Sequence, residues 1–101
     1  MTAALLSPAA RRDLLTATQW IAADNPIAAR GLRDSVAKAA RRIGAHPDIG
    51  LRRPELADQR YRFLPLTGLP YVIVYNSARQ PPLIVRVPHT SRDLPNALKA
   101  F

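Results

Sequence analysis

Apolar residues follow two different periods along the chain. Between residues 8 and 43 they recur every three or four positions, which is the period of helices with one buried face. Between residues 61 and 87 they form short β-branched and aromatic runs bounded by Pro, Gly and Asn, a pattern typical of covered strands. The sequence therefore predicts a domain in which helices cover a sheet.

The first half predicts a short strand over residues 3–6 and then two helices. Ser7 can cap a helix whose first position is Pro8, where a missing N–H costs nothing. Asn25 and Pro26 repeat this signature after a tight turn, so the helices should form an antiparallel hairpin. The expected buried stripes are Ala10, Leu14, Ala17 and Ile21 in the first helix, and Ala29, Leu32, Val36, Ala39 and Ile43 in the second.

The second helix is expected to end at Gly44, since glycine is the usual residue after a helix C-terminus. Residues 46–50 are turn material. Residues 51–59 contain Arg and Pro without a clear period, which predicts a loop that can include one helical turn.

Three strands are predicted next, over residues 61–66, 71–75 and 83–87, joined by short turns into an antiparallel meander. Pro65 cannot donate to a ladder, so it should lie at an edge or a bulge. Residues 94–101 are predicted to form a short tail with about one helical turn.

The fold expected is α+β: an N-terminal strand, an antiparallel two-helix hairpin packed on a mainly antiparallel sheet, and a three-strand C-terminal meander. The length of 101 residues and the hydrophobic content of 48% suit one compact domain spanning residues 1–101.

The net charge of the chain indicates which kind of partner it binds. Fifteen Lys and Arg against seven Asp and Glu give a net charge of +8, and thirteen of the cations are Arg. An acidic partner is expected, either nucleic acid or an acidic protein segment. The chain has no cysteine and its two histidines are far apart, so we expect neither a metal site nor a cofactor. The apolar start is broken by Ser7, Pro8 and Arg11, which predicts a cytoplasmic protein without a membrane segment.

Candidate chemistry lies in and after the meander, where four basic side chains could converge: Arg62, Arg86, His89 and Arg92. Such a cluster could bind a phosphate, with His89 moving a proton. No nucleophile and base pair is defined, however. The alternative is that Arg86 lies on a solvated strand face while His89, Arg92 and Asp93 make local turn hydrogen bonds.

Aromatic and paired basic residues offer weaker signals. Trp20 could be a binding anchor, although packing near a helix end is favoured. Tyr71 and Tyr75 share one strand face and should lie in the core rather than stack on bases. Three Arg pairs could follow a phosphate backbone, but aromatics make up only 6% of the chain and are not interleaved with them. Direct nucleic-acid binding is therefore not required.

Short motifs follow one another in a distinctive order along nearly the whole chain. They are residues 6–14, Trp20 with Ile21, Asn25 with Pro26, His46 with Pro47, Gly50, Arg62, residues 71–75, Arg86 with Val87, and His89 with residues 92–94. This ordered set resembles the ParE toxins of the RelE/ParE superfamily. The resemblance implies a small fold with a helical hairpin on an antiparallel sheet, in agreement with the hydrophobic pattern.

The resemblance further implies the toxin half of a type II toxin–antitoxin module. ParE toxins usually target DNA gyrase and trap its cleaved-DNA complex, which stalls replication. A ParD-like antitoxin with an acidic C-terminal segment neutralises them in a hetero-oligomer, consistent with the charge of +8. We expect the target to be bound by Arg86, His89, Arg92 and Asp93 together with the C-terminal tail. The residues expected to bind the antitoxin are Trp20, Leu32, Arg33 and Val36, beside the hairpin and sheet.

Two other functions stay open. RelE-like toxins are ribosome-dependent mRNA endoribonucleases, and in that case Arg62, Arg86, His89 and Arg92 would be catalytic. Such enzymes typically carry a tyrosine near the C-terminus, which residues 96–101 lack, so a gyrase poison without enzymatic activity is favoured. The third function is a DNA- or RNA-binding accessory module, which the charge favours and the aromatic content does not.

Overall fold

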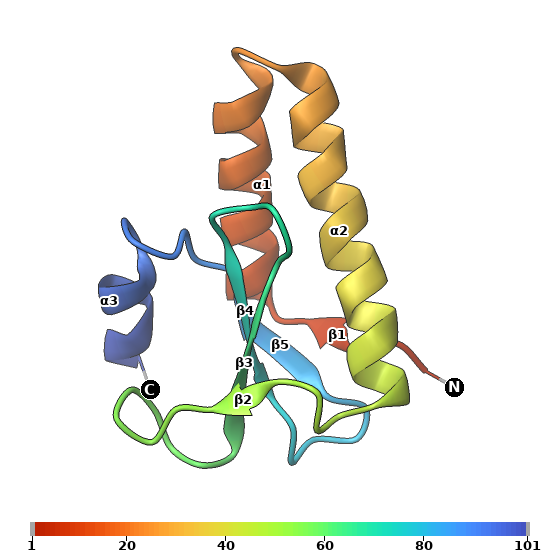
Figure 1. The fold of residues 1–101 in the computed structure, drawn as a ribbon, viewed down its shortest axis with the longest axis vertical. Coiled ribbons are helices and arrows are strands. Elements are labelled where there is room, and N and C mark those ends of the chain that lie inside the picture. The colour runs from red at the N-terminus through yellow and green to blue at the C-terminus, as the bar shows by residue number, and fades with distance from the viewer. Residues whose placement is uncertain (1, 101) are drawn as a thin grey trace.

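The computed structural model describes residues 2–100, which form a helical hairpin standing over a five-stranded sheet (Figure 1). Met1 and Phe101, the two ends of the predicted domain, lie outside the described residues. The elements are β1 (Leu5–Leu6), α1 (Pro8–Ala22), α2 (Pro26–Ala45), β2 (Leu51–Arg52), β3 (Tyr61–Pro65), β4 (Val72–Asn76), β5 (Leu83–Arg86), α3 (Leu94–Ala97) and the 3₁₀ turn η1 (Leu98–Ala100). The α+β architecture is the predicted one.

Both helices begin at the predicted caps. The Ser7 hydroxyl accepts a hydrogen bond from the Ala10 amide at 3.1 Å, and the Asn25 side chain accepts one from the Ala28 amide at 3.1 Å. The five stripe residues of α2 are all buried, whereas α1 buries its two alanines and leaves Leu14 and Ile21 half-buried. The hairpin therefore presents α2 more fully to the core.

The sheet order is β1-β5-β4-β3-β2. β3, β4 and β5 form the predicted antiparallel meander, while β1 pairs in parallel with β5 and makes the sheet mixed. The loop predicted for residues 51–59 is wrong at its start, because Leu51 and Arg52 pair with Phe63 and Arg62 of β3. Pro65 lies beyond this pairing, so its missing N–H faces no β2 partner.

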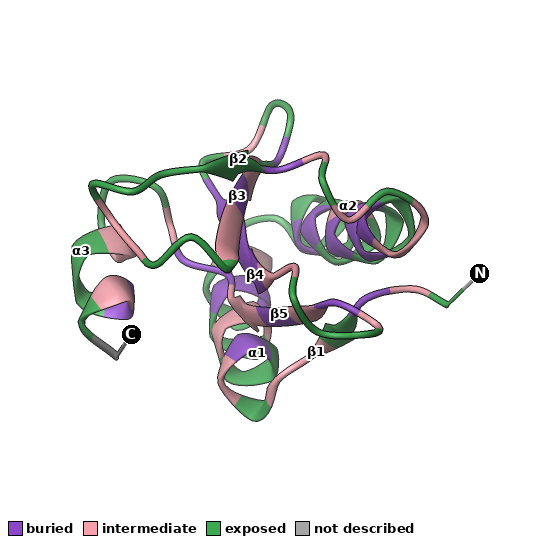
Figure 2. Cartoon of the chain, turned by 90° about the horizontal axis from the view of Figure 1, so that it is seen from below, coloured by how far each residue is buried: buried purple, intermediate pink, exposed green. Residues whose placement is uncertain are grey.

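The sheet separates two apolar clusters, with the hairpin on one side and α3 on the other (Figure 2). The hairpin face carries Tyr71, Ile73 and Tyr75 of the predicted aromatic run, which confirms that both tyrosines are core residues. On the other face, Val72 and Val74 pack with side chains of α3 and η1. The C-terminal tail is thus helical, as predicted, and it covers the second face.

The prediction that Gly44 ends α2 is wrong. The helix continues through Ala45, and the amide of His46 still donates to the Arg42 carbonyl at 2.8 Å. A Cβ at Gly44 would collide with the backbone of Thr2 and Ala3. The glycine therefore allows the N-terminal segment to cross α2 closely, where the Ala4 amide donates to the Ala40 carbonyl at 2.9 Å.

Candidate functional site

A groove of about 460 Å³ opens between α1 and the end of the sheet, and we call it the α1 groove. Its lining residues come from three segments: Arg12, Asp13, Thr16, Ala17 and Trp20 of α1, Tyr71 and Val87 at the end of the sheet, and Arg92 and Asp93 before α3. The floor is apolar and the rim is charged. Such a combination is typical of a binding surface.

Helical spacing places the α1 side of this groove. Arg12, Thr16 and Trp20 are four positions apart and share one line along α1. On the opposite side of the groove, Tyr71 and His89 form an antiparallel bridge. This bridge holds the segment after β5 against the start of β4. Across the groove, the guanidinium carbon of Arg92 lies 5.8 Å from the centre of the Trp20 ring.

Beneath the groove, Asp13 joins α1 to β5. Its carboxylate accepts hydrogen bonds from Arg86 Nε at 2.7 Å, Arg86 Nη2 at 2.9 Å and the Val87 amide at 2.9 Å. The two side chains are only 17% and 26% exposed, and the hydrogen bond with Asp13 raises the pKa of Arg86. Arg86 is therefore half-buried and engaged by Asp13 rather than free on a solvated strand face.

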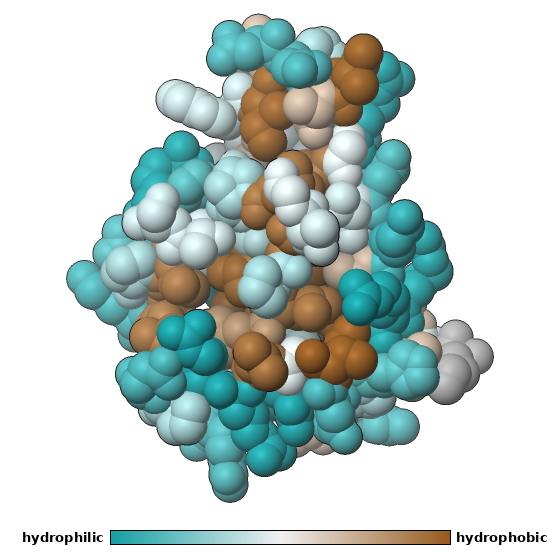
Figure 3. Space-filling view, viewed as in Figure 1, coloured by the Kyte–Doolittle hydropathy of each residue, from teal (hydrophilic) through white to brown (hydrophobic). Residues whose placement is uncertain are grey.

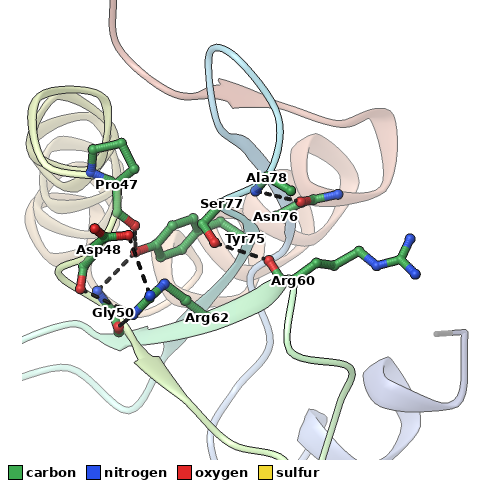
Figure 4. A network of polar contacts seen from close by, with 9 residues as sticks. All are labelled: Pro47, Asp48, Gly50, Arg60, Arg62, Tyr75, Asn76, Ser77 and Ala78. Carbon is green, nitrogen blue, oxygen red and sulfur yellow. Dashed lines mark hydrogen bonds and ion pairs between the residues drawn. The ribbon is translucent and has the colours of Figure 1, made fainter.

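Arg62 belongs to a separate network, where β3 pairs with β2 (Figure 4). It donates to the carbonyls of Gly50 at 2.9 Å and Asp48 at 3.3 Å. The fully buried Tyr75 donates from its hydroxyl to the Pro47 carbonyl at 2.6 Å and accepts from the Gly50 amide at 2.9 Å. Burial raises the pKa of this hydroxyl. The network fastens residues 47–50 to β3 and β4.

His89 caps the turn that leads into α3. Its Nδ1 accepts from the amides of Arg92 at 3.1 Å and Ser91 at 3.3 Å, so this ring nitrogen acts as a hydrogen-bond acceptor within the turn. The ring meets Tyr71 edge-on, with centroids 5.3 Å apart. Arg92 also forms a half-exposed ion pair with Asp93 at 3.5 Å. These contacts agree with the predicted alternative of local turn hydrogen bonds.

Comparison with known families identifies the family of the chain. A family model described as "ParE toxin of type II toxin-antitoxin system, parDE" matches residues 4–94. The chain belongs to the ParE toxin family. No curated protein matches it.

In this ParE-family chain, the four predicted catalytic side chains do not form one hydrogen-bonded cluster. Arg62 is bound by the loop before β2, Arg86 by α1, and His89 by its own turn. Of the predicted target-binding residues, Arg92 and Asp93 line the α1 groove. They share this surface with Trp20, a residue that was predicted to bind the antitoxin.

The residues predicted to bind the antitoxin divide between surface and core. Trp20 is 69% exposed, so the prediction that it packs into the protein is wrong. Arg33 is exposed on α2. Leu32 and Val36 are only 0% and 1% exposed and belong to the core between α2 and the sheet. Because a buried helix stripe faces its own sheet, neither can meet a second protein in this conformation of the ParE-family chain.

The sequence did not identify six of the groove residues: Arg12, Asp13, Thr16, Ala17, Tyr71 and Val87. A signal existed for the α1 members, since Arg12 and Thr16 precede Trp20 at intervals of one helical turn. No local signal exists for Val87, which reaches the groove through the pairing of β5 with β4.

The described residues 2–100 contain no group of three His, Asp or Glu side chains that could hold a metal ion. Within the same residues, no helix has the length and hydrophobicity needed to cross a membrane.

Proposed function

We propose that this ParE-family chain poisons DNA gyrase by binding it and trapping its cleaved-DNA complex, and that an acidic ParD-like antitoxin neutralises it. The observation that carries the proposal is the α1 groove, where Trp20 and Arg92 lie exposed on an apolar floor. A binding surface of this kind suits a toxin that acts by contact. Such action requires the chain and gyrase to share the cytoplasm.

The contacts of the basic residues favour this function over the RelE-like ribonuclease. A ribonuclease needs cations directed at the scissile phosphate and a side chain that moves a proton. Arg62 and Arg86 already bind carbonyl and carboxylate oxygens of this chain, and His89 Nδ1 already accepts two amides. Redirecting them would break contacts that hold the fold together.

The antitoxin proposal rests on charge and on exposed apolar side chains. The face in Figure 3 has an apolar band between and below the hairpin helices, bordered by hydrophilic residues. Leu15, Trp20 and Ile27 of the hairpin are 56%, 69% and 73% exposed. An acidic chain that wraps the toxin would cover such side chains while meeting its net charge of +8.

Induction of the chain in a bacterial host separates the two functions. A gyrase poison should stop incorporation of labelled thymidine before that of labelled methionine, because replication meets the trapped complexes first. We expect the Arg92→Ala variant to lose most of this effect. The Arg79→Ala control should keep it, since it removes an equal charge from the turn between β4 and β5. If protein synthesis stopped first, with transcripts cut on ribosomes, the ribonuclease would replace our proposal.

A further inference from the structure

We propose that the exposed side of α2 binds the backbone of duplex DNA without regard to its sequence. Five cations of that helix carry this inference, and we call them the α2 basic face: Arg30, Arg33, Lys38, Arg41 and Arg42. The choice of DNA as the partner rests on the proposed function, because a poisoned gyrase holds duplex DNA. The inference adds a direct contact between the chain and that DNA.

Helical spacing gathers these cations on one side of α2. The opposite side carries the buried stripe from Ala29 to Ile43, which belongs to the core, whereas all five cations are exposed. At a rise of about 1.5 Å per residue, Arg30 and Arg42 are separated by about 18 Å of helix, roughly half of one turn of B-DNA. Hydrophilic side chains follow this outer side of α2 in Figure 3.

The α2 basic face has little compensating charge. Asp34 is the only carboxylate of α2, so five cations and one anion give the helix a net charge of +4, half of the +8 of the whole chain. Within residues 2–100, none of the five cations forms an ion pair. The arginines that do form one lie elsewhere: Arg53, Arg60, Arg62, Arg86 and Arg92. The cations of α2 are therefore available to phosphates, whose condensed counterions they would release on binding.

The side chains around these cations favour a phosphate backbone over a protein surface. Ala28, Gly31 and Ala37 are exposed and small, so a partner backbone can approach the helix closely. Among the residues of α2, all of which the structure describes, the only large apolar side chain that is exposed is Ile27 in the first turn. A protein interface needs large anchors at its centre, and a single-stranded nucleic acid needs aromatic rings on which bases stack. The α2 basic face has neither, so the regular phosphates of a duplex fit it best.

The α2 basic face is separate from the α1 groove. The groove is lined by α1, the end of the sheet and the segment before α3, without any residue of α2. In Figure 2 the buried side of α2 is turned toward the sheet and its exposed side away from it. One chain can therefore contact gyrase through the groove and DNA through α2 at the same time. Such a double contact would oppose the release of cleaved DNA.

Fluorescence anisotropy of a labelled DNA duplex, titrated with the full-length chain alone, tests the inference. We expect binding that does not depend on the duplex sequence and that weakens steeply with salt. The Arg30→Gln/Arg41→Gln variant should bind about tenfold more weakly at low salt and reduce the salt slope by about two, because two phosphate contacts are lost. Arg33→Gln/Lys38→Gln should do the same. Glutamine keeps a high helix propensity, so α2 should stay folded, as circular dichroism would verify.

The matched control is Arg60→Gln/Arg79→Gln, which removes the same charge from exposed positions outside α2. It should bind DNA within about twofold of the unaltered chain, since salt screens charges that do not touch the duplex. Equal weakening by the control and the α2 variants would overturn the inference, because net charge alone would then explain the binding. Tighter binding of poly-glutamate or of single-stranded oligothymidylate than of the duplex would also overturn it.

This titration contains no gyrase, so the inference and the proposed function can fail separately. Duplex binding as predicted, without trapped gyrase complexes, would remove the proposed target and leave the α2 basic face as a DNA-binding surface. Trapped complexes that form equally well with the Arg30→Gln/Arg41→Gln variant, without duplex binding by the chain alone, would overturn the inference and leave the proposed target in place.

Discussion

Asp13 is the only carboxylate of α1, and it accepts three hydrogen bonds from the end of β5. The pair that it forms with Arg86 joins residues 73 positions apart in the sequence. It therefore sets where α1 lies against the sheet, and with it the width of the α1 groove. A single side chain thus connects the stability of the fold to the shape of the candidate site.

We predict that Asp13→Asn lowers the free energy of unfolding by about 1–3 kcal/mol, because Arg86 would be left partly buried without its charge partner. Urea denaturation provides the measurement. Asp34→Asn, which changes an exposed carboxylate on α2, is the control and should stay within about 0.5 kcal/mol of the unaltered chain. Equal stability of the two variants would show that the pair does not hold α1 in place.

Tyr75 makes stability depend on pH. Burial raises the pKa of its hydroxyl above the ordinary value of 10.0, so the folded chain favours the neutral form. Above about pH 10 the unfolded chain ionises more readily, and the stabilisation present at lower pH is lost as the pH rises through the folded-state pKa.

In Tyr75→Phe this alkaline loss should be smaller. At neutral pH the variant should be about 1–3 kcal/mol less stable, because the Gly50 amide and the Pro47 carbonyl lose their partner. Urea unfolding at neutral pH and above pH 10 measures both effects. A variant that loses as much stability at alkaline pH as the unaltered chain would place the responsible group elsewhere.

At the scale of elements, α2 has the more completely buried apolar stripe of the two hairpin helices. The N-terminal segment also packs against this helix. Its two glycines lie in different surroundings. Gly44 lies against the backbone of Thr2 and Ala3, whereas nothing lies within 4 Å of a Cβ built on Gly31. The same substitution should therefore have opposite effects at these two positions.

We predict that Gly31→Ala stabilises the protein by about 0.5–1 kcal/mol, since alanine is the better helix former. Gly44→Ala should instead destabilise it by about 1–3 kcal/mol, because the methyl group would push Thr2 and Ala3 away from α2. Thermal unfolding of both variants is the test. A stabilising Gly44→Ala would mean that the N-terminal segment is not held against the helix.

The elements that could be predicted from sequence are those with local causes. Ser7 with Pro8 and Asn25 with Pro26 signal the helix starts because each cap uses amides within three residues of itself. The end of α2 could not be read in this way, since the reason for Gly44 is a contact with Thr2. β2 was missed because a strand of two residues has no period and exists through its pairing with β3.

The candidate site was predictable only in part, for the same reason. Trp20, Arg92 and Asp93 were assigned to binding surfaces through the resemblance to the ParE family, and the structure brings them to one groove. What Arg62 and Arg86 bind depends on residues distant in sequence, so no spacing argument could tell an exposed cation from one already engaged.

At the scale of the whole molecule, the structural network of Tyr75 and the candidate site lie toward opposite ends of β4. The core of α2 and the network of Tyr75 hold one end, while the α1 groove gathers an exposed aromatic residue and charged groups at the other. The net charge of +8 draws acidic partners to the surface as a whole. Within it, the α1 groove is where we expect the target to bind.

The most direct test of gyrase poisoning uses purified chain, gyrase and closed circular DNA, and measures the fraction of linear DNA that is covalently attached to gyrase. We predict that this fraction rises with the unaltered chain and with Arg79→Ala, and rises much less with Arg92→Ala. Gyrase that keeps full supercoiling activity, without trapped DNA at any concentration of the chain, would contradict the proposed mechanism.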